Sequence, residues 1–211
     1  MRSRKSARAA VTVIVLALLV GLLGGCGEQK PVDGFITIKG EKISVDETSL
    51  LLRAGHCDSK NLRPLKWLTN LTELDLGYNQ ISDLTPLKTL TNLTELHLGG
   101  NQIINLTPLE KLTNLSKLDL YSNKISDLTP LASLTNLTEL ALSANQISDL
   151  SPLAELTNLA HLNLWNNQIS NLTPLSSLTN LTSLDLQYNP LAQQQIDDLQ
   201  TALPNCNIHF N

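Results

Sequence analysis

Three residues with the chemistry of a hydrolytic catalyst follow one another at a constant spacing in this chain. Glu139, His161 and Ser183 are separated by equal intervals of sequence, and a carboxylate, an imidazole and a hydroxyl are the groups that a serine hydrolase combines. Catalysis would also require an oxyanion hole and a substrate pocket. On neighbouring strands of a regular sheet the backbone N–H groups are used in strand pairing, so we expect no enzymatic activity from these residues.

A second series at the same spacing contains candidate metal ligands. Asp75, His97 and Asp119 are separated by the same interval, and carboxylates together with an imidazole can bind a divalent cation. A cross-strand ion pair is the more ordinary role for such residues. The sequence also has no glycine-rich phosphate loop, no C-x-x-C and no H-E-x-x-H. We therefore expect neither a metal site nor a cofactor.

Both series arise because one sequence segment recurs along the chain at a fixed interval. The segment LTNLTELDLGYNQISDLTPLKT begins at Leu68 and returns at Leu90, Leu112, Leu134 and Leu156, with a partial copy from Leu178. In every complete copy the same seven positions hold Leu or Ile, which in the first copy are Leu68, Leu71, Leu74, Leu76, Ile81, Leu84 and Leu87. This repetition predicts a stack of similar coils that bury their apolar side chains against one another.

The order of polar and apolar positions predicts the shape of one coil. Leu74 and Leu76 are next-but-one neighbours in the sequence, so both point to the same side of a short strand. Pro86 and its counterparts favour a short 3₁₀ or extended return segment over a long α-helix. In each copy the chain turns out of the strand at an asparagine, whose side-chain amide can form hydrogen bonds with backbone groups of adjacent coils. We expect an internal ladder of Asn79, Asn101, Asn123, Asn145, Asn167 and Asn189.

The pattern L-x-x-L-x-L-x-x-N-x-I-x-x-L-x-P-L resembles the 22-residue leucine-rich repeat of internalin-type bacterial surface proteins, over about residues 46–210. The resemblance implies an α/β fold, a right-handed curved solenoid with a parallel sheet on its concave face and 3₁₀ segments on its convex face. It also implies adhesion to a host or another cell surface, by analogy of fold. We assign the regular repeats to residues 68–189.

The segment before the repeats departs from the pattern, as a terminal coil of a solenoid does. We assign residues 35–67 to an N-terminal cap, in which residues 35–38 and 43–45 form a small hairpin over the open end of the core. A degenerate coil follows the hairpin. A shift of one full repeat back from the first regular coil places Cys57 in the asparagine position, and the leucine-rich-repeat pattern accepts cysteine there.

The segment after the repeats also departs from the pattern. We assign residues 190–211 to a C-terminal cap. Apolar residues at helical spacing predict an α-helix over 192–202, and Pro204 follows it. Cys206, Ile208 and Phe210 then alternate, which predicts a last strand.

A disulfide between Cys57 and Cys206 is excluded by the predicted stack. The two residues lie seven coils apart, which is about 34 Å at the spacing of neighbouring strands. A disulfide requires Cα atoms about 5.5 Å apart. We therefore expect two buried structural thiols.

Residues 1–25 have the composition of an export signal. Four basic residues precede an apolar run from Ala9 to Leu23, which is typical of a secretory signal and short for a bilayer span of about 20 residues. An uncleaved membrane anchor is the alternative. The run ends in Leu-Gly-Gly-Cys26, similar to the lipobox of bacterial lipoproteins, which implies cleavage immediately before Cys26 and a lipid on its sulfur. We expect a tether over residues 26–34 and an exported protein, lipid-anchored to the bacterial cell envelope.

The charge of the chain argues against nucleic-acid binding. The formal net charge is −4, but four of the basic residues lie in the expected export signal. Without them, 11 basic residues face 19 acidic ones, a net charge of −8. Binding to phosphates requires a basic stripe, and the sequence after the signal has none.

The exposed positions of the strands are where a binding surface can differ from the scaffold. Tyr121 and Trp165 occupy such positions two coils apart, with the small residues Ser143 and Ala141 between them, which predicts a shallow depression walled by two aromatic rings. Tyrosine and tryptophan are favoured interface anchors. The predicted ligand-binding residues on the concave face are Tyr121, Trp165, Lys117, Asp119, His161 and Asn163.

The function that we predict is a monomeric module that binds a protein on its concave face, with a glycan as a further ligand class. The alternative is a structural envelope protein without a dedicated ligand, which the near-identity of the coils favours. The N-x-S/T sequons that recur at one position of the repeat, at Asn70, Asn92, Asn114, Asn136 and Asn180, are explained by the repetition itself.

Overall fold

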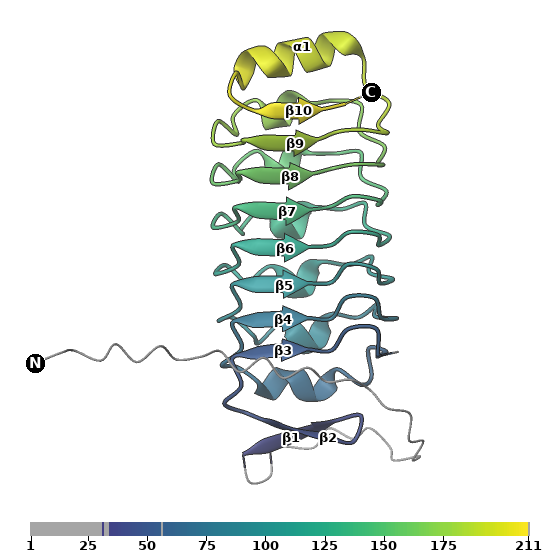
Figure 1. Cartoon of the computed structure of the whole chain (residues 1–211), viewed down its shortest axis with the longest axis vertical. Coiled ribbons are helices and arrows are strands. Elements are labelled where there is room, and N and C mark those ends of the chain that lie inside the picture. The colour runs from purple at the N-terminus through teal and green to yellow at the C-terminus, as the bar shows by residue number, and fades with distance from the viewer. Residues whose placement is uncertain (1–30, 32–33, 56, 211) are drawn as a thin grey trace, which may run out of the picture.

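The computed structural model describes residues 31, 34–55 and 57–210, which form one stack of coils (Figure 1). The predicted export signal, Cys26 and most of the predicted tether lie outside the described residues. Eight short parallel strands pair in chain order and form one sheet along the stack. They are β3 (Ser49–Leu51), β4 (Glu73–Asp75), β5 (Glu95–His97), β6 (Lys117–Asp119), β7 (Glu139–Ala141), β8 (His161–Asn163), β9 (Ser183–Asp185) and β10 (Asn207–His209). This is the predicted α/β leucine-rich-repeat solenoid, and its coils rise with a right-handed sense.

The leucine and isoleucine positions of the repeat form the core between the sheet and the return segments. In the five complete copies all of these side chains are at most 2% exposed. One coil alone would leave them in water, whereas stacking buries them against the coils on both sides. Burial of each such side chain contributes roughly 1.5–3 kcal/mol, so the repeated leucines are what hold the coils together.

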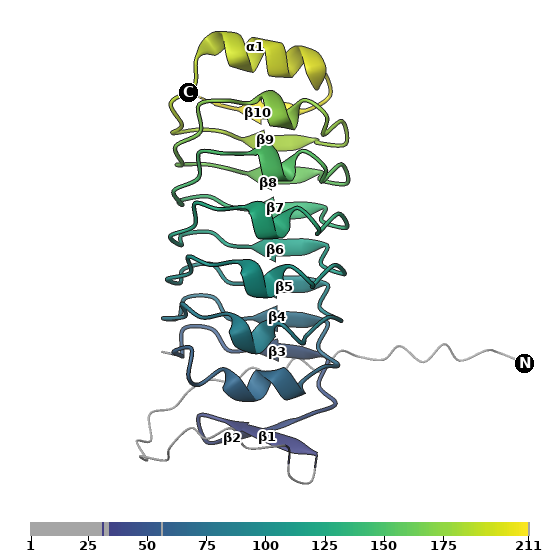
Figure 2. The ribbon, with the colours of Figure 1, turned by 180° about the vertical axis from the view of Figure 1, so that it is seen from behind.

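Short 3₁₀ helices lie across the core from the sheet, as Figure 2 shows from behind. Each regular one begins with Thr-Pro-Leu or Ser-Pro-Leu, and its proline stands in the first turn, where the missing N–H costs nothing. The elements are η1 (Arg63–Trp67), η2 (Thr85–Leu87), η3 (Thr107–Leu109), η4 (Thr129–Leu131), η5 (Ser151–Leu153) and η6 (Thr173–Leu175). The proline pattern therefore predicted the return segments correctly.

The predicted frame of the first coil is wrong. Leu50 of β3 pairs with Leu74 of β4, whereas the regular repeat would have placed Leu52 there. Cys57 consequently occupies the position of Ile81 and not that of the asparagine, because its carbonyl accepts the Gln80 N–H just as the Ile81 carbonyl accepts the Gln102 N–H. The first coil is therefore longer than the others, and its extra length lies in the turn after Cys57. In that turn Asp58 Oδ1 accepts the Lys60 and Asn61 N–H groups at 3.0 Å each.

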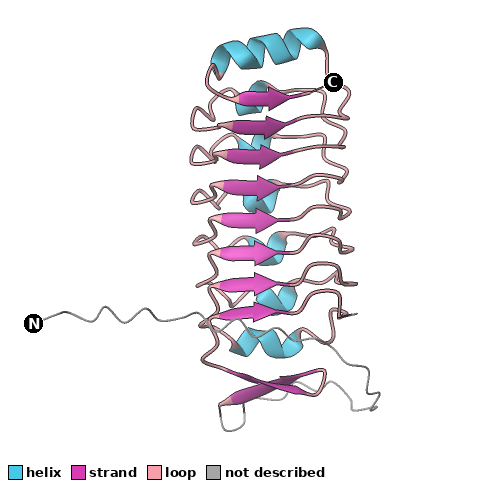
Figure 3. Cartoon of the chain, in the orientation of Figure 1, coloured by secondary structure: helices cyan, strands magenta, loops and turns pink. Residues whose placement is uncertain are grey.

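Two caps close the ends of the core (Figure 3). At the N-terminal end β1 (Phe35–Ile38) and β2 (Glu41–Ser44) form an antiparallel hairpin whose isoleucines are buried. At the C-terminal end α1 (Gln193–Ala202) buries Ile196 and Leu199. Phe210 does not belong to the last strand as predicted, since β10 ends at His209 and Phe210 is 38% exposed.

Cys57 and Cys206 are free and buried, as the predicted stack requires. Burial raises the pKa of both thiols, which keeps them protonated and unreactive. Within the part of the chain that the structure describes, no helix has the length and apolar character needed to cross a bilayer.

Candidate functional site: the sheet face

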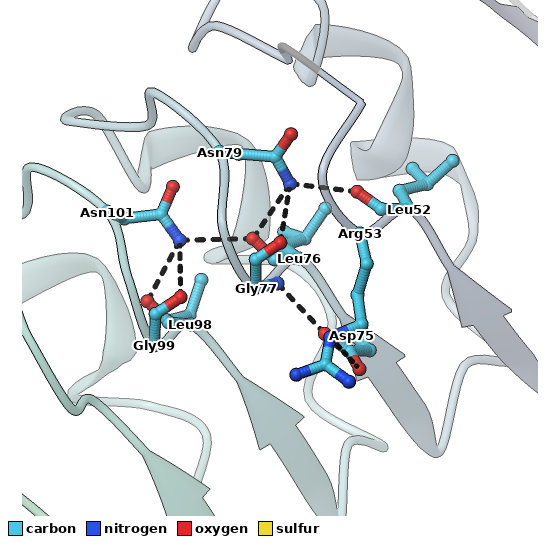
Figure 4. A network of polar contacts seen from close by, with 9 residues as sticks. All are labelled: Leu52, Arg53, Asp75, Leu76, Gly77, Asn79, Leu98, Gly99 and Asn101. Atoms are coloured by element: carbon cyan, nitrogen blue, oxygen red, sulfur yellow. Dashed lines mark hydrogen bonds and ion pairs between the residues drawn. The ribbon is translucent and has the colours of Figure 1, made fainter. Parts of the chain in front are cut away.

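The inner asparagines join each coil to the one before it (Figure 4). Asn101 Nδ2 donates to the carbonyl oxygens of Leu76 in the preceding coil and Leu98 in its own, at 3.0 and 2.9 Å. Its Oδ1 accepts the Ile81 N–H at 3.0 Å. The equivalent asparagines bond in the same manner at 79, 123, 145, 167 and 189. This ladder satisfies buried backbone groups and sets the spacing of the strands.

A second asparagine ladder runs along the outside of the coils. Asn114 Nδ2 donates to the Thr91 carbonyl of the preceding coil at 2.9 Å, and the same bond recurs at Asn92, Asn136, Asn158 and Asn180. This role was not predicted from the sequence, in which most of these residues lie in sequons that the repetition explains. The available signal was Asn158, which is followed by Leu159 and Ala160 and so keeps the asparagine without keeping the sequon.

The sheet face is the side of the eight-stranded sheet that points away from the leucine core. Strand pairing aligns its side chains in rows across the coils, so that Glu139 neighbours His161, and His161 neighbours Ser183. In the next row along the strands, Asp119 neighbours Ala141, and Ala141 neighbours Asn163. The strand register therefore confirms that residues one repeat apart in the sequence are neighbours on the sheet face.

The aspartate or asparagine at the end of β6, β8 and β9 accepts a hydrogen bond from the backbone N–H two residues later. Asp119 Oδ1 accepts the Tyr121 N–H at 2.9 Å, and Asn163 Oδ1 accepts the Trp165 N–H at 3.0 Å. Asp185 bonds to the Gln187 N–H in the same way at 3.1 Å. Aspartate and asparagine make the same turn at this position, so the backbone does not require the negative charge.

A groove of about 460 Å³ is hollowed into the sheet face over β5 to β10. The floor of the groove has a small side chain at Ala141, where the neighbouring coils have the larger Asp119 and Asn163. Four of the six predicted binding residues line it. The polar side chains along the groove are those of His97, Lys117, Asp119, Glu139, His161, Asn163, Ser183, Asp185, Gln187 and His209.

The other two predicted residues, Tyr121 and Trp165, are not among the residues that line the groove. The Tyr121 ring lies against Gly99, where an added Cβ would be 3.2 Å from Tyr121 Cδ1. Trp165 is partly buried and packs edge-on against Tyr188, with ring centroids 5.3 Å apart and planes at 74°. Each ring thus has a neighbour in another coil, and the two rings do not wall the depression between them.

Lys117 and Arg53 on this face each form ion pairs. Lys117 Nζ lies 3.4 Å from Glu139 Oε1 and 3.9 Å from Glu95 Oε1, one on each neighbouring strand. Arg53 Nε lies 3.2 Å from Asp75 Oδ2 (Figure 4), and its guanidinium stands 5.2 Å from the centroid of the Tyr78 ring. These pairs are partly exposed, so each adds little to stability, but Glu95 and Glu139 neutralise the positive charge of Lys117 at the groove.

The groove does not assemble catalytic or metal-binding geometry. Among the described residues no hydrogen bond joins Glu139, His161 and Ser183, although they are neighbours across the strands. Nor does the described part of the chain contain a group of three His, Cys, Asp or Glu side chains placed to hold a metal ion. In the Asp75, His97 and Asp119 series, the Asp75 carboxylate is already bonded to Arg53 and to the Gly77 N–H.

The repeats match a known family model, described as leucine-rich repeats in two copies, over residues 69–111, 91–133, 113–155 and 157–205. The chain belongs to the leucine-rich repeat family. Solenoids of this kind present an extended surface for binding and are in general interaction scaffolds rather than enzymes.

Solved structures place it among proteins of the internalin type. Internalin C2 from Listeria monocytogenes is 39% identical, with a TM-score of 0.73 over 80% of this chain and 74% of that one. An internalin (inlF) from the same species is 35% identical, with a TM-score of 0.73 over 81% and 50%. A leucine-rich repeat protein from Leptospira interrogans is 28% identical, with a TM-score of 0.58 over 78% and 46%. No curated protein matches the chain.

Proposed function

We propose that this chain is a protein-binding module that receives its partner in the groove of the sheet face. The observation that carries the proposal is the groove itself. A solenoid with identical coils would have the same side chain at this position of every strand, whereas here Ala141 leaves a hollow bordered by charged and polar side chains. The inner ladder fixes the strands, so the binding surface is preformed and little ordering is needed on association. Tyr121 and Trp165 stand beside the groove as candidate rim contacts.

We also propose that the protein is exported and lipid-anchored through Cys26. The charged start, the short apolar run and Leu-Gly-Gly-Cys support this proposal. A groove on an exported module would face partners outside the cytoplasm. Metabolic labelling with radioactive palmitate tests the anchor, and Cys26→Ala should abolish the label and release the protein from the membrane fraction. A labelled Cys26→Ala protein would rule out this attachment site.

Capture of surface proteins tests the groove. Ala141→Trp fills the hollow without touching the core, whereas Tyr78→Ala alters an exposed ring that does not line the groove. We expect the wild type and Tyr78→Ala to retain one partner from surface extracts and Ala141→Trp to lose it, with unchanged melting temperatures. The Tyr121→Ala/Trp165→Ala double variant should weaken capture if the rim contributes.

The alternative function is a structural envelope protein without a dedicated ligand. The near-identity of the coils favours it, because a specialised binding surface would vary more from coil to coil than the scaffold does. This alternative predicts that no partner distinguishes the wild type from Ala141→Trp. A purified glycan retained in the absence of protein would instead place the ligand in the carbohydrate class.

A further inference from the structure

Charge is distributed unevenly along the solenoid. Residues 68–210 contain four Lys or Arg against thirteen Asp or Glu, a net charge of −9. The last basic residue is Lys124, and residues 125–211 have seven acidic side chains and no Lys or Arg. The groove extends from β5 to β10 and so lies mostly over this acidic half of the chain.

The charges that line the groove are not balanced. Its one Lys or Arg, Lys117, is held between Glu95 and Glu139. Among the described residues Asp119 and Asp185 form no ion pair with Lys or Arg, and the residues beside them on the neighbouring strands include His97 and His209. Each uses Oδ1 to accept a backbone N–H, and Asn163 makes the same bond without a charge. Two carboxylates are therefore present where the fold would accept amides, on either side of the floor at Ala141.

The separation of the two carboxylates has a matching length in an extended chain. Asp119 ends β6 and Asp185 ends β9, three strand spacings apart, which is about 14 Å. Four residues of extended chain also span about 14 Å, and side chains four positions apart project from the same side of a strand. A partner segment running along the solenoid axis would place side chains i and i+4 over Asp119 and Asp185.

We infer that the groove recognises an extended, basic protein segment that presents Lys or Arg at positions i and i+4, one opposite Asp119 and one opposite Asp185. This inference rests on the proposed function, because it names the chemistry of the partner for the same groove. The segment passes over Ala141, where the small side chain leaves room for its backbone. Opposite charges in the partner also steer its approach to an acidic surface.

Selection from a random dodecapeptide display library on the full-length chain tests the inference. We expect peptides selected by the wild type to be enriched in Lys or Arg pairs at i and i+4 relative to the starting library. The matched variant is Asp119→Asn/Asp185→Asn, which keeps the turn bonds that Asn163 already shows and removes only the charges. A synthetic peptide from the wild-type selection should bind this variant about tenfold more weakly, and raised salt should weaken wild-type binding.

Two other results separate the inference from the proposed function. Peptides that bind the wild type, are excluded by Ala141→Trp and carry no excess of basic pairs would overturn the inference and leave groove binding intact. Peptides that bind the wild type and Ala141→Trp equally, or no selected peptides at all, would overturn both.

A control peptide with its two lysines adjacent should bind more weakly than one with lysines at i and i+4, and equal binding would overturn the proposed spacing.

Discussion

At the scale of single residues, the inner and outer asparagines make a contrast that the sequence alone does not show. Asn145 is buried and bonds through Nδ2 to the carbonyls of Leu120 and Leu142 and through Oδ1 to the Ile125 N–H. Asn136 is exposed and donates one bond, to the Thr113 carbonyl. Both residues recur in every coil, so recurrence does not distinguish a buried network from a surface contact.

Replacing the two types of asparagine should therefore have unequal effects. We expect Asn145→Ala to lower the free energy of unfolding by about 2–4 kcal/mol, because several buried backbone groups lose their partner at once. Asn136→Ala should cost less than about 1 kcal/mol, since water replaces its single bond. Urea denaturation of both variants measures the difference. Equal losses would show that the inner ladder is not the stronger connection.

Acidic residues before the 3₁₀ helices should make the fold sensitive to acid. The hydroxyl and backbone N–H of the next-but-one residue hold the pKa of Asp83, Asp127 and Asp149 below the ordinary value of 3.8. A carboxyl whose pKa is lower in the folded chain stabilises the fold at pH above the unfolded pKa, and this stabilisation is lost as the pH falls through the folded pKa.

The chain contains its own control for this acid effect. Asn105 and Asn171 occupy the same position in other coils and accept the same N–H bond at 2.9 and 3.0 Å without titrating. We expect Asp83→Asn/Asp127→Asn/Asp149→Asn to lose less stability than the wild type between about pH 5 and about pH 2. Urea midpoints across this range measure it, and parallel curves for the two proteins would contradict the account.

At the scale of the elements, each coil leaves its strand through a residue in the left-handed region of backbone space. Tyr78, Ser122, Ala144, Asn166 and Tyr188 have φ between 51° and 57°. In the coil that contains β5 the position is Gly100, with φ of 69°. Side chains with a Cβ are disfavoured there, and glycine is not. The turn is imposed by the coil geometry, so most coils retain a strained residue.

Glycine exchange in both directions tests this strain. Ala144→Gly should raise the free energy of unfolding by about 0.5–1 kcal/mol, because the Cβ penalty of the left-handed region is removed. Gly100→Ala should lower it by about 1–2 kcal/mol, since the new Cβ would also stand 2.8 Å from Tyr78 Cδ1. Thermal and urea unfolding give the signs. A destabilised Ala144→Gly would mean that the alanine side chain packs favourably.

The first coil shows where periodicity stops being informative. Five complete copies established the register of the repeat, because each apolar position was confirmed by its neighbours in the stack. The first coil has no preceding copy, and its frame was extended by arithmetic across Asp58 to Asn61, where the turn is longer than in the regular coils. The polar run Asp-Ser-Lys-Asn was the available signal for a longer turn.

At the scale of the whole molecule, stability should depend on the unbroken stack of leucines. Leu140 is 2% exposed in the middle of the solenoid, and Leu140→Ala should cost about 2–5 kcal/mol because the neighbouring coils cannot close the cavity. Ile104 is 61% exposed where four other coils have serine. Ile104→Ser should change stability by less than about 0.5 kcal/mol. Urea denaturation compares the two, and a tolerated Leu140→Ala would contradict the stacking account.

The candidate site could be predicted only in part. The repeat register brings Lys117, Asp119, His161 and Asn163 together, and all four line the groove. The sequence position of an aromatic residue does not predict the direction of its side chain, because that direction depends on the space that the neighbouring coils leave. The Tyr121 ring lies against Gly99, and the Trp165 ring packs against Tyr188. Charge, by contrast, is visible in sequence, and the absence of Lys and Arg after Lys124 is a signal for the acidic half.

Site-specific photo-crosslinking in intact cells tests most directly the central claim that a protein partner binds in the groove. A benzophenone amino acid is placed at position 187, which lines the groove, and separately at position 104, which is exposed in the loop between β5 and η3. We expect one discrete protein adduct from position 187 and none of that size from position 104. The same adducts from both positions, or an adduct from position 104 alone, would contradict binding in the groove.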